Sequence, residues 1–149
     1  MRFSLLGVIP FIIHLGLLVS TQGSSAPQNL DRESERHFVR GVQFQQQGDL
    51  QNARLAYEAA LKSAPRRVDV LSNLGSVFAQ LNDYDKAIQH YRKALAVNPA
   101  LYQVRYHLGA AYALAQDTVN ARLTLGKLLD RQQTFEGADD ARRILASVK

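Results

Sequence analysis

Residues 68–101 read VDVLSNLGSVFAQLNDYDKAIQHYRKALAVNPAL, and the pattern of this stretch recurs before and after it. Its glycine, Gly75, stands 34 residues after Gly41 and 34 residues before Gly109. A fixed interval of about 20–50 residues is typical of repeat architectures, in which each unit buries its apolar face against its neighbours. The sequence therefore predicts a stack of similar units.

Other residue types keep the same interval. Aspartates and alanines recur in all three units, aromatic residues recur at two positions, and prolines close the first two units. Agreement among so many residue types indicates a true internal repeat. The residues are Asp49, Asp83 and Asp117; Ala53, Ala87 and Ala121; Phe44, Phe78 and Tyr112; Tyr57 and Tyr91; and Pro65 and Pro99.

Each unit is predicted to form two helices joined by a short turn. Each aspartate of the repeat stands just before the second helix, at the N-cap position. Its carboxylate can accept hydrogen bonds from the free backbone N–H groups of that helix. The prolines cannot extend the second helices, so the chain is expected to turn there. The expected first helices are 34–47, 68–81 and 102–115, and the expected second helices are 50–63, 84–97 and 118–131.

The three repeated glycines lie inside the first helices, where each costs about 1 kcal/mol relative to alanine. A cost at one position in every unit requires a packing reason. We expect each glycine to let its helix approach the small alanine of the paired helix, and Tyr57 and Tyr91 to fill the gap towards the following unit. The expected pairs are Gly41 with Ala53, Gly75 with Ala87 and Gly109 with Ala121.

The chain resembles the tetratricopeptide repeat (TPR) family, whose pattern over 34 residues is W-x₂-L-G-x₂-Y…A-x₃-F…P. The resemblance covers 34–135 and departs in the outer units, where His37 and Arg40 replace large apolar residues and Gln133 replaces the proline. It implies an all-α solenoid of three helix-turn-helix units. The second unit matches best, through Leu71, Leu74, Gly75, Phe78, Ala87, Tyr91, Ala94 and Pro99.

The C-terminal residues predict one more helix. Ala141, Ile144, Leu145 and Val148 form an apolar stripe at helical spacing, and no repeat glycine is present. We expect this helix to cover the open edge of the third unit. The expected division is signal peptide 1–23, linker 24–33, TPR units 34–67, 68–101 and 102–135, and capping helix 136–149.

The N-terminal residues resemble a secretory signal peptide. Arg2 precedes an apolar run over 5–19, and small residues favour cleavage after Gly23. Pro10 and His14 disfavour a spanning helix. The expected location is exported, either periplasmic or secreted. An uncleaved membrane anchor and a buried cytosolic helix remain alternatives.

Little in the sequence predicts catalysis. The chain has no cysteine, no HExxH motif around His37, His90 or His107, and no GxSxG, Walker-type or GxGxxG motif. We therefore expect no enzyme activity, no metal and no cofactor. The 18 Lys and Arg residues exceed the 13 Asp and Glu residues, but they are interleaved with acids and lack stacking aromatics, so nucleic acid is not an expected partner.

The family resemblance implies a concave groove formed by the first helix of each unit. Family members that bind chaperones clamp a carboxylate with lysine, asparagine and arginine side chains. Of the corresponding residues here, Phe38, Val42, Asn73, Gln103 and His107, only Asn73 fits. The expected peptide-binding residues are Phe38, Val42, Gln45, Asn73, Ser76, Gln80, Gln103, Tyr106, His107 and Ala110.

The sequence thus predicts a non-enzymatic, exported scaffold or adaptor that binds a protein or peptide in this groove, within an envelope assembly. The alternative is a structural module that oligomerises through the edges of its array. Phe38 and Tyr106 have a second interpretation, as residues that only pack between units. Contact with a membrane is expected only during transit or through an uncleaved anchor.

Overall fold

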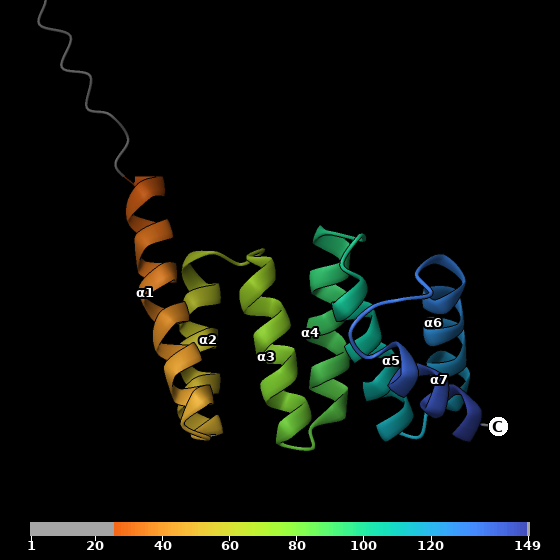
Figure 1. The fold of residues 1–149 in the computed structure, drawn as a ribbon. Helices are drawn as coiled ribbons and strands as arrows, with labels where there is room; N and C mark the ends of the chain where they lie inside the picture. Colours follow the sequence, from red (N-terminus) through yellow and green to blue (C-terminus); the bar gives the residue numbers. More distant parts are fainter. Residues whose placement is uncertain (1–25, 149) are drawn as a thin grey trace, which may run out of the picture.

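The computed structural model describes residues 26–148, which form antiparallel α-helices and short turns without any strand (Figure 1). The expected signal peptide lies outside the described residues. Each repeat contributes two helices, and one helix follows the third repeat. The helices are α1 (Ala26–Gln46), α2 (Leu50–Ser63), α3 (Val68–Gln80), α4 (Tyr84–Val97), α5 (Tyr102–Leu114), α6 (Thr118–Arg131) and α7 (Ala138–Ser147).

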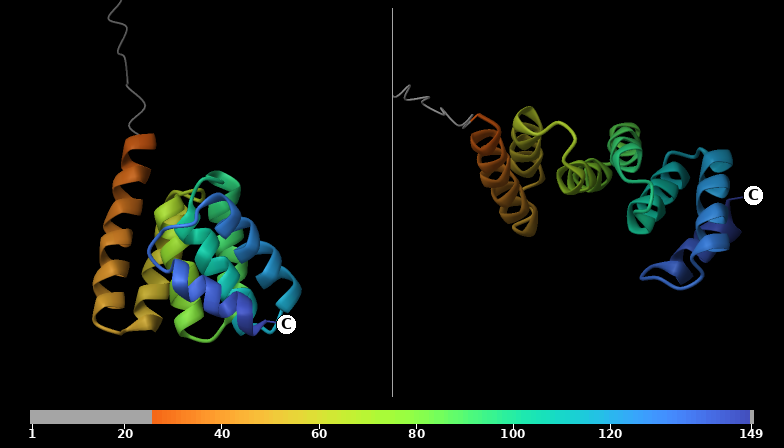
Figure 2. Two further views of the ribbon diagram at one scale, coloured as in Figure 1. Left: turned by 45° about the vertical axis from the view of Figure 1, so that its right-hand side comes forward. Right: turned by 90° about the horizontal axis from the view of Figure 1, so that it is seen from above.

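The helices stand in two rows, which the view from above in Figure 2 separates. We call α1, α3, α5 and α7 the inner layer and α2, α4 and α6 the outer layer. Each helix of the repeats packs against the helices before and after it, and α7 packs against both α5 and α6. The all-α solenoid predicted from the 34-residue interval is therefore confirmed.

The repeated aspartates cap the outer-layer helices as predicted. In each unit the carboxylate accepts a hydrogen bond from the backbone N–H three residues later, at 3.1–3.2 Å. Each aspartate follows a residue with positive φ, which reverses the chain in the short turn between the two helices. The capping residues are Asp49, Asp83 and Asp117, and the residues with positive φ are Gly48, Asn82 and Gln116.

The first helix is longer than the sequence suggested. The expected linker over 24–33 is wrong from Ala26 onward, because α1 begins there, eight residues before Ser34. Pro27 lies in the first turn, where a missing backbone donor is tolerated. The residues from Asn29 to Glu33 contain no glycine or proline that would interrupt a helix.

The repeat glycines face large side chains, so the predicted glycine–alanine packing is wrong. A Cβ built on Gly75 would lie 2.7 Å from the ring of Tyr91, and one on Gly41 would lie 2.5 Å from the ring of Tyr57. On Gly109 it would lie 2.4 Å from Leu125. The large residue stands one helical turn beyond the alanine, and the missing Cβ makes room for it.

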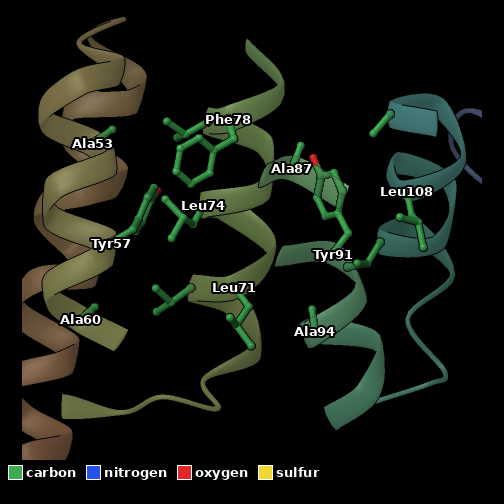
Figure 3. Packing of buried hydrophobic residues seen from close by; sticks show 14 residues of the cluster. Ala53, Tyr57, Ala60, Leu71, Leu74, Phe78, Ala87, Tyr91, Ala94 and Leu108 are labelled. Atoms are coloured by element: carbon green, nitrogen blue, oxygen red, sulfur yellow. The ribbon is translucent and has the colours of Figure 1, made fainter. Parts of the chain in front are cut away.

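The core runs continuously through the repeats between the two layers (Figure 3). Tyr57 from α2 points towards Leu74 of α3 in Figure 3, and the Tyr91 ring lies 6.0 Å from the His107 ring on α5. Both rings also lie against the repeat glycine of their own unit, so they pack within a unit as well as between units. Tyr57 and Leu74 are fully buried. The repeated alanines Ala53 and Ala87 are also fully buried, because the helices pack closely around them.

Helix α7 covers the third unit, as the sequence predicted. Its buried residues are Ala138 and Ala141, and Val148 is buried just after it, whereas Ile144 and Leu145 are half-buried. The hydroxyl of Tyr106 on α5 donates a hydrogen bond to Asp140 on α7. The apolar stripe and this bond together attach the helix to the array.

Candidate functional site

All ten residues predicted to bind a peptide lie on the first helices of the units. The helices that carry them, α1, α3 and α5, stand in one row of the array (Figure 2). Gln80 and His107 are exposed and the other eight are half-buried, so none of the ten is fully buried in the core. We call this set the inner face: Phe38, Val42 and Gln45 on α1; Asn73, Ser76 and Gln80 on α3; and Gln103, Tyr106, His107 and Ala110 on α5.

On α1, two of these residues contact the core. The ring of Phe38 lies 6.0 Å from the ring of Tyr57, and the carboxamide oxygen of Gln45 accepts a hydrogen bond of 2.9 Å from the Tyr57 hydroxyl. Burial, with a smaller effect of the Asp69 charge, raises the pKa of Tyr57 to about 12, so this hydroxyl remains a donor. The side chains of Phe38 and Gln45 thus serve packing as well as lining the inner face.

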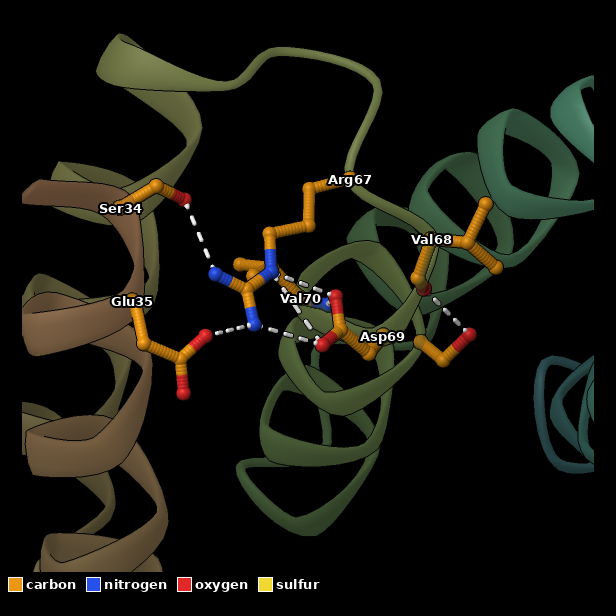
Figure 4. A network of polar contacts seen from close by, with 7 residues as sticks. Ser34, Glu35, Arg67, Val68, Asp69 and Val70 are labelled. Atoms are coloured by element: carbon orange, nitrogen blue, oxygen red, sulfur yellow. Dashed lines mark hydrogen bonds and ion pairs between the residues drawn. The ribbon is translucent and has the colours of Figure 1, made fainter. Parts of the chain in front are cut away.

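Arg67, just before α3, connects α1 to α3 at one end of the inner face (Figure 4). Its guanidinium donates to Glu35 at 2.6 Å and to Asp69 at 2.9 Å, and lies 4.6 Å from the centre of the Phe38 ring. Burial tends to raise the pKa of Asp69, but hydrogen bonds from Arg67 and from the Val70 amide outweigh burial and lower it. Both carboxylates are therefore already bound to one cation.

Sequence reasoning missed Arg67. The equivalent residue of the next unit is Leu101, so the repeat pattern gives no signal for it. The adjacent Asp69 was the only available hint, because Arg and Asp two residues apart before a helix can pair. The structure shows that Arg67 also binds Glu35 on α1.

The α3 part of the inner face is polar and uncharged. The Gln80 amide donates to the Ser76 hydroxyl at 3.1 Å. Burial raises the pKa of Tyr91 to about 12, and a hydrogen bond with Ser76 opposes this effect. Within residues 26–148 the side chain of Asn73 makes no hydrogen bond, so its amide can both donate to and accept from a ligand.

The α5 part is aromatic and joins the cap. His107 lies between Tyr106, at 5.1 Å between ring centres, and Tyr91, at 6.0 Å. Desolvation by these neighbours lowers the pKa of His107, although part of the side chain is exposed. Tyr106 also lies 5.9 Å from Phe135 and bonds to Asp140, so it fastens α5 to the C-terminal segment.

A cavity of about 450 Å³ lies away from the inner face, between α2 and α4. Its lining includes Arg54, Glu58, Lys86 and His90. His90 stacks on Phe78 with 5.4 Å between ring centres, and its buried Nδ1 has no hydrogen-bond partner among the described residues. Burial is the main cause that lowers the pKa of His90.

The described residues contain no group of three or more histidine, aspartate or glutamate side chains that could hold a metal ion. Within the same part of the chain, no helix is long and apolar enough to cross a bilayer. What the inner face offers chemically is hydrogen bonding and apolar contact along an extended surface.

The two-layered stack, the 34-residue interval and the capped turns define a helical repeat protein. Residues 38–101 match the family model described as tetratricopeptide repeat. Together with the fold, this match identifies these residues as tetratricopeptide repeats.

Two curated proteins show partial similarity. The chain is 31% identical over 75 residues to the BBSome complex member BBS4 of Bos taurus, and 29% identical over 85 residues to the photosystem I assembly protein Ycf3 of Prochlorococcus marinus (strain NATL2A). These regions cover 50% and 55% of this chain but only 14% and 49% of the relatives. The chain thus spans at most about half the length of these relatives.

Solved structures share the fold over most of the described residues. The first TPR of Spaghetti (RPAP3), bound to the HSP90 peptide SRMEEVD, has a TM-score of 0.72 and 19% identity over 79% of this chain and 94% of that chain. The MamA protein has a TM-score of 0.73 and 22% identity over 78% of this chain and 62% of that chain. At these identities the similarity shows the fold alone.

Proposed function

We propose that the protein is a non-enzymatic adaptor that binds a protein or peptide segment on its inner face. The observation that carries this proposal is the Asn73 amide, which is half-buried at the middle of the inner face and unbonded within the described residues. An extended peptide could satisfy this amide with its own backbone. Structural neighbours bound to the peptides SRMEEVD and SGPTIEEVD support a ligand-binding use of the same fold.

The chemistry of the inner face favours an uncharged or basic segment over an acidic one. Those two peptides end in acidic residues, whereas the ten residues of the inner face include no lysine or arginine. Arg67 is a cation at one end of this face, and it is already paired with Glu35 and Asp69. An acidic tail would meet two carboxylates there without an unpaired base.

Substitution of Asn73 by arginine tests this proposal. Asn73→Arg adds bulk and a positive charge to the inner face, so we expect the partner recovered with a tagged chain to fall by at least about tenfold. Gln89→Arg is the matched control, because Gln89 is exposed on the outer layer. Quantitative mass spectrometry of both pull-downs compares the two variants. Equal partner recovery with wild type and Asn73→Arg would contradict the proposal.

We propose further that the protein is exported and acts as a scaffold in an envelope assembly. The support is the sequence of residues 1–23, with its basic start, apolar run and small residues before the expected cleavage point. Cell fractionation with the mass of the recovered chain tests export. A chain that begins near Ser24 outside the cytosol is the expected result, and an intact cytosolic chain would contradict it.

Self-association through an array edge is the second candidate, and one observation favours it. The edge of the first unit has no covering helix within the described residues, and a cavity of about 220 Å³ there is lined by Phe44, Leu55 and Ala59. Leu55 is 52% exposed. A sedimentation experiment that shows a concentration-independent monomer would exclude this candidate.

A further inference from the structure

The positive charge of the protein is concentrated in one layer. The inner-layer helices are balanced, with six basic and six acidic residues, whereas the outer-layer helices carry eight basic and three acidic residues. The outer-layer helices therefore hold a surplus of five positive charges, which the aspartates that cap their N-termini, Asp49, Asp83 and Asp117, reduce to two. Its bases are Arg54, Lys62, Lys86, Arg92, Lys93, Arg122, Lys127 and Arg131, and its acids are Glu58, Asp85 and Asp130.

Most of these bases are available to a partner. Arg54 pairs with Glu58, and Lys86 pairs with the capping carboxylate Asp83. The other six form no salt bridge with any described residue, and all six are exposed. Four of the six, Arg92, Lys93, Lys127 and Arg131, lie in the second halves of α4 and α6, away from the capping aspartates at the turns.

Apolar side chains accompany the bases on α6. Val119 is 74% exposed and Leu123 is 52% exposed. They are four residues apart and therefore share one side of the helix, next to Arg122. The equivalent residues of the second unit are the polar Asp85 and Gln89. The third repeat thus has aliphatic residues at positions that face solvent in the second repeat.

We propose that the outer layer, through α4 and α6, docks on the surface of an anionic lipid bilayer. Clustered Lys and Arg side chains are attracted to anionic headgroups, and exposed aliphatic residues beside them can enter the interface. Nucleic acid fits less well, because stacking on bases needs exposed aromatics. The aromatics of the outer layer are Tyr57, Tyr84 and Tyr91, and none of them is exposed.

This orientation would place the inner layer away from the bilayer, because the two layers lie on opposite sides of the array (Figure 2). The inner face would remain open to a partner while the outer layer contacts lipid. Docking of this kind is peripheral and separate from any contact made by the N-terminal residues.

Vesicle co-sedimentation of the protein purified from cells expressing the full chain tests the proposal. Wild type is compared on neutral vesicles and on vesicles with about 30 mol% anionic lipid at about 0.1 M salt. Wild type is expected to bind the anionic vesicles. The double variant Arg92→Glu with Lys127→Glu is expected to lower this binding by at least tenfold. Arg32→Glu combined with Arg36→Glu is the control, because it changes the net charge equally on the inner-layer helix α1 and should retain most of the binding.

A second pair of variants tests the aliphatic contact. Val119→Gln with Leu123→Gln should lower vesicle binding severalfold even at high salt, whereas Leu114→Gln should not. Leu114 is 57% exposed on α5, and its equivalents in the other units are Gln46 and Gln80. Circular dichroism confirms that each variant is folded.

Three results would overturn the proposal. Equal binding to neutral and anionic vesicles would assign the contact to another part of the chain. Equal losses in the two charge-reversed variants would show a response to net charge alone. Binding to an oligonucleotide without binding to anionic vesicles would identify the outer layer as a nucleic-acid surface.

Discussion

At the scale of single residues, glycine sets the distance between the two helices of each repeat. A Cβ at Gly75 would meet the ring of Tyr91 at a distance that real Cβ contacts do not reach, and Tyr91 is only 3% exposed. The sequence showed that the glycine position needed a packing reason. It did not show which residue packs against Gly75. Ala87 and Tyr91 both recur at the same interval as the glycine, so the repeat does not distinguish between them.

Gly75→Ala should destabilise the protein even though alanine favours a helix. The expected loss is about 1–3 kcal/mol of unfolding free energy, because the added methyl group forces the Tyr91 ring or α3 to shift. Gly126→Ala is the matched control. Gly126 lies within α6, has no atom within 4 Å of a built Cβ, and should gain about 0.5–1 kcal/mol. Denaturant unfolding measures both, and a stabilising Gly75→Ala would contradict the packing described.

His90 makes stability depend on pH. Because burial lowers its folded-state pKa below the ordinary value of 6.5, the unfolded chain binds more protons than the folded chain in the window below 6.5. Stability should therefore fall as the pH is lowered through this window. His107, whose pKa is also lowered, should contribute in the same direction.

Thermal unfolding at about pH 7.5 and about pH 5 measures this effect. His90→Gln should reduce the difference between the Tm at the higher pH and the Tm at the lower pH. The double variant His90→Gln with His107→Gln should reduce this difference further. A difference in Tm that is unchanged in the double variant would contradict the assignment to these two histidines.

At the scale of elements, the repeat made the helices predictable. The three outer-layer helices begin and end where expected, because each has an aspartate cap at its start, and α3 and α5 differ by one residue at their ends. The extension of α1 was not predictable from the repeat, because residues 26–33 have no equivalent inside it. Its polar sequence resembles a linker as much as a solvated helix.

The capping helix supplies a prediction at this scale. Ala141 on α7 is fully buried, so Ala141→Asp places an unpaired carboxylate against the array and should undock the helix. Amide hydrogen exchange in α7 and in the adjoining parts of α5 and α6 should accelerate by ~10-fold or more, with α2 unaffected. Ala146→Asp is the control, because Ala146 is exposed on the same helix. Equal exchange in both variants would contradict a docked cap.

At the scale of the whole molecule, the sequence predicted which helices carry the inner face but not how its residues are used. All ten predicted residues lie on the inner layer, because the repeat assigns them to the first helix of each unit. Side-chain contacts between different helices could not be predicted from the repeat. Arg67 covers Phe38, Gln45 binds Tyr57 and Tyr106 binds Asp140, so these three residues of the inner face also hold the array together.

The separation of charge between the layers also appears only in the folded molecule. The interleaved bases of the sequence suggested a solvated surface with no favoured side. Because the bases of α4 and α6 fall on second helices, the fold gathers them on the layer opposite the inner face. The two sides of the array therefore differ in chemistry.

Photo-crosslinking in the cell tests the proposed use of the inner face most directly. A photoreactive residue at position 80 lies on the inner face and leaves Asn73 intact, and one at position 89 lies on the outer layer. The expected result is a discrete protein adduct from position 80 that is absent from position 89 and that disappears when Asn73→Arg is added. An adduct with the same protein from position 89 alone, or adducts only with a second copy of the chain, would contradict binding on the inner face.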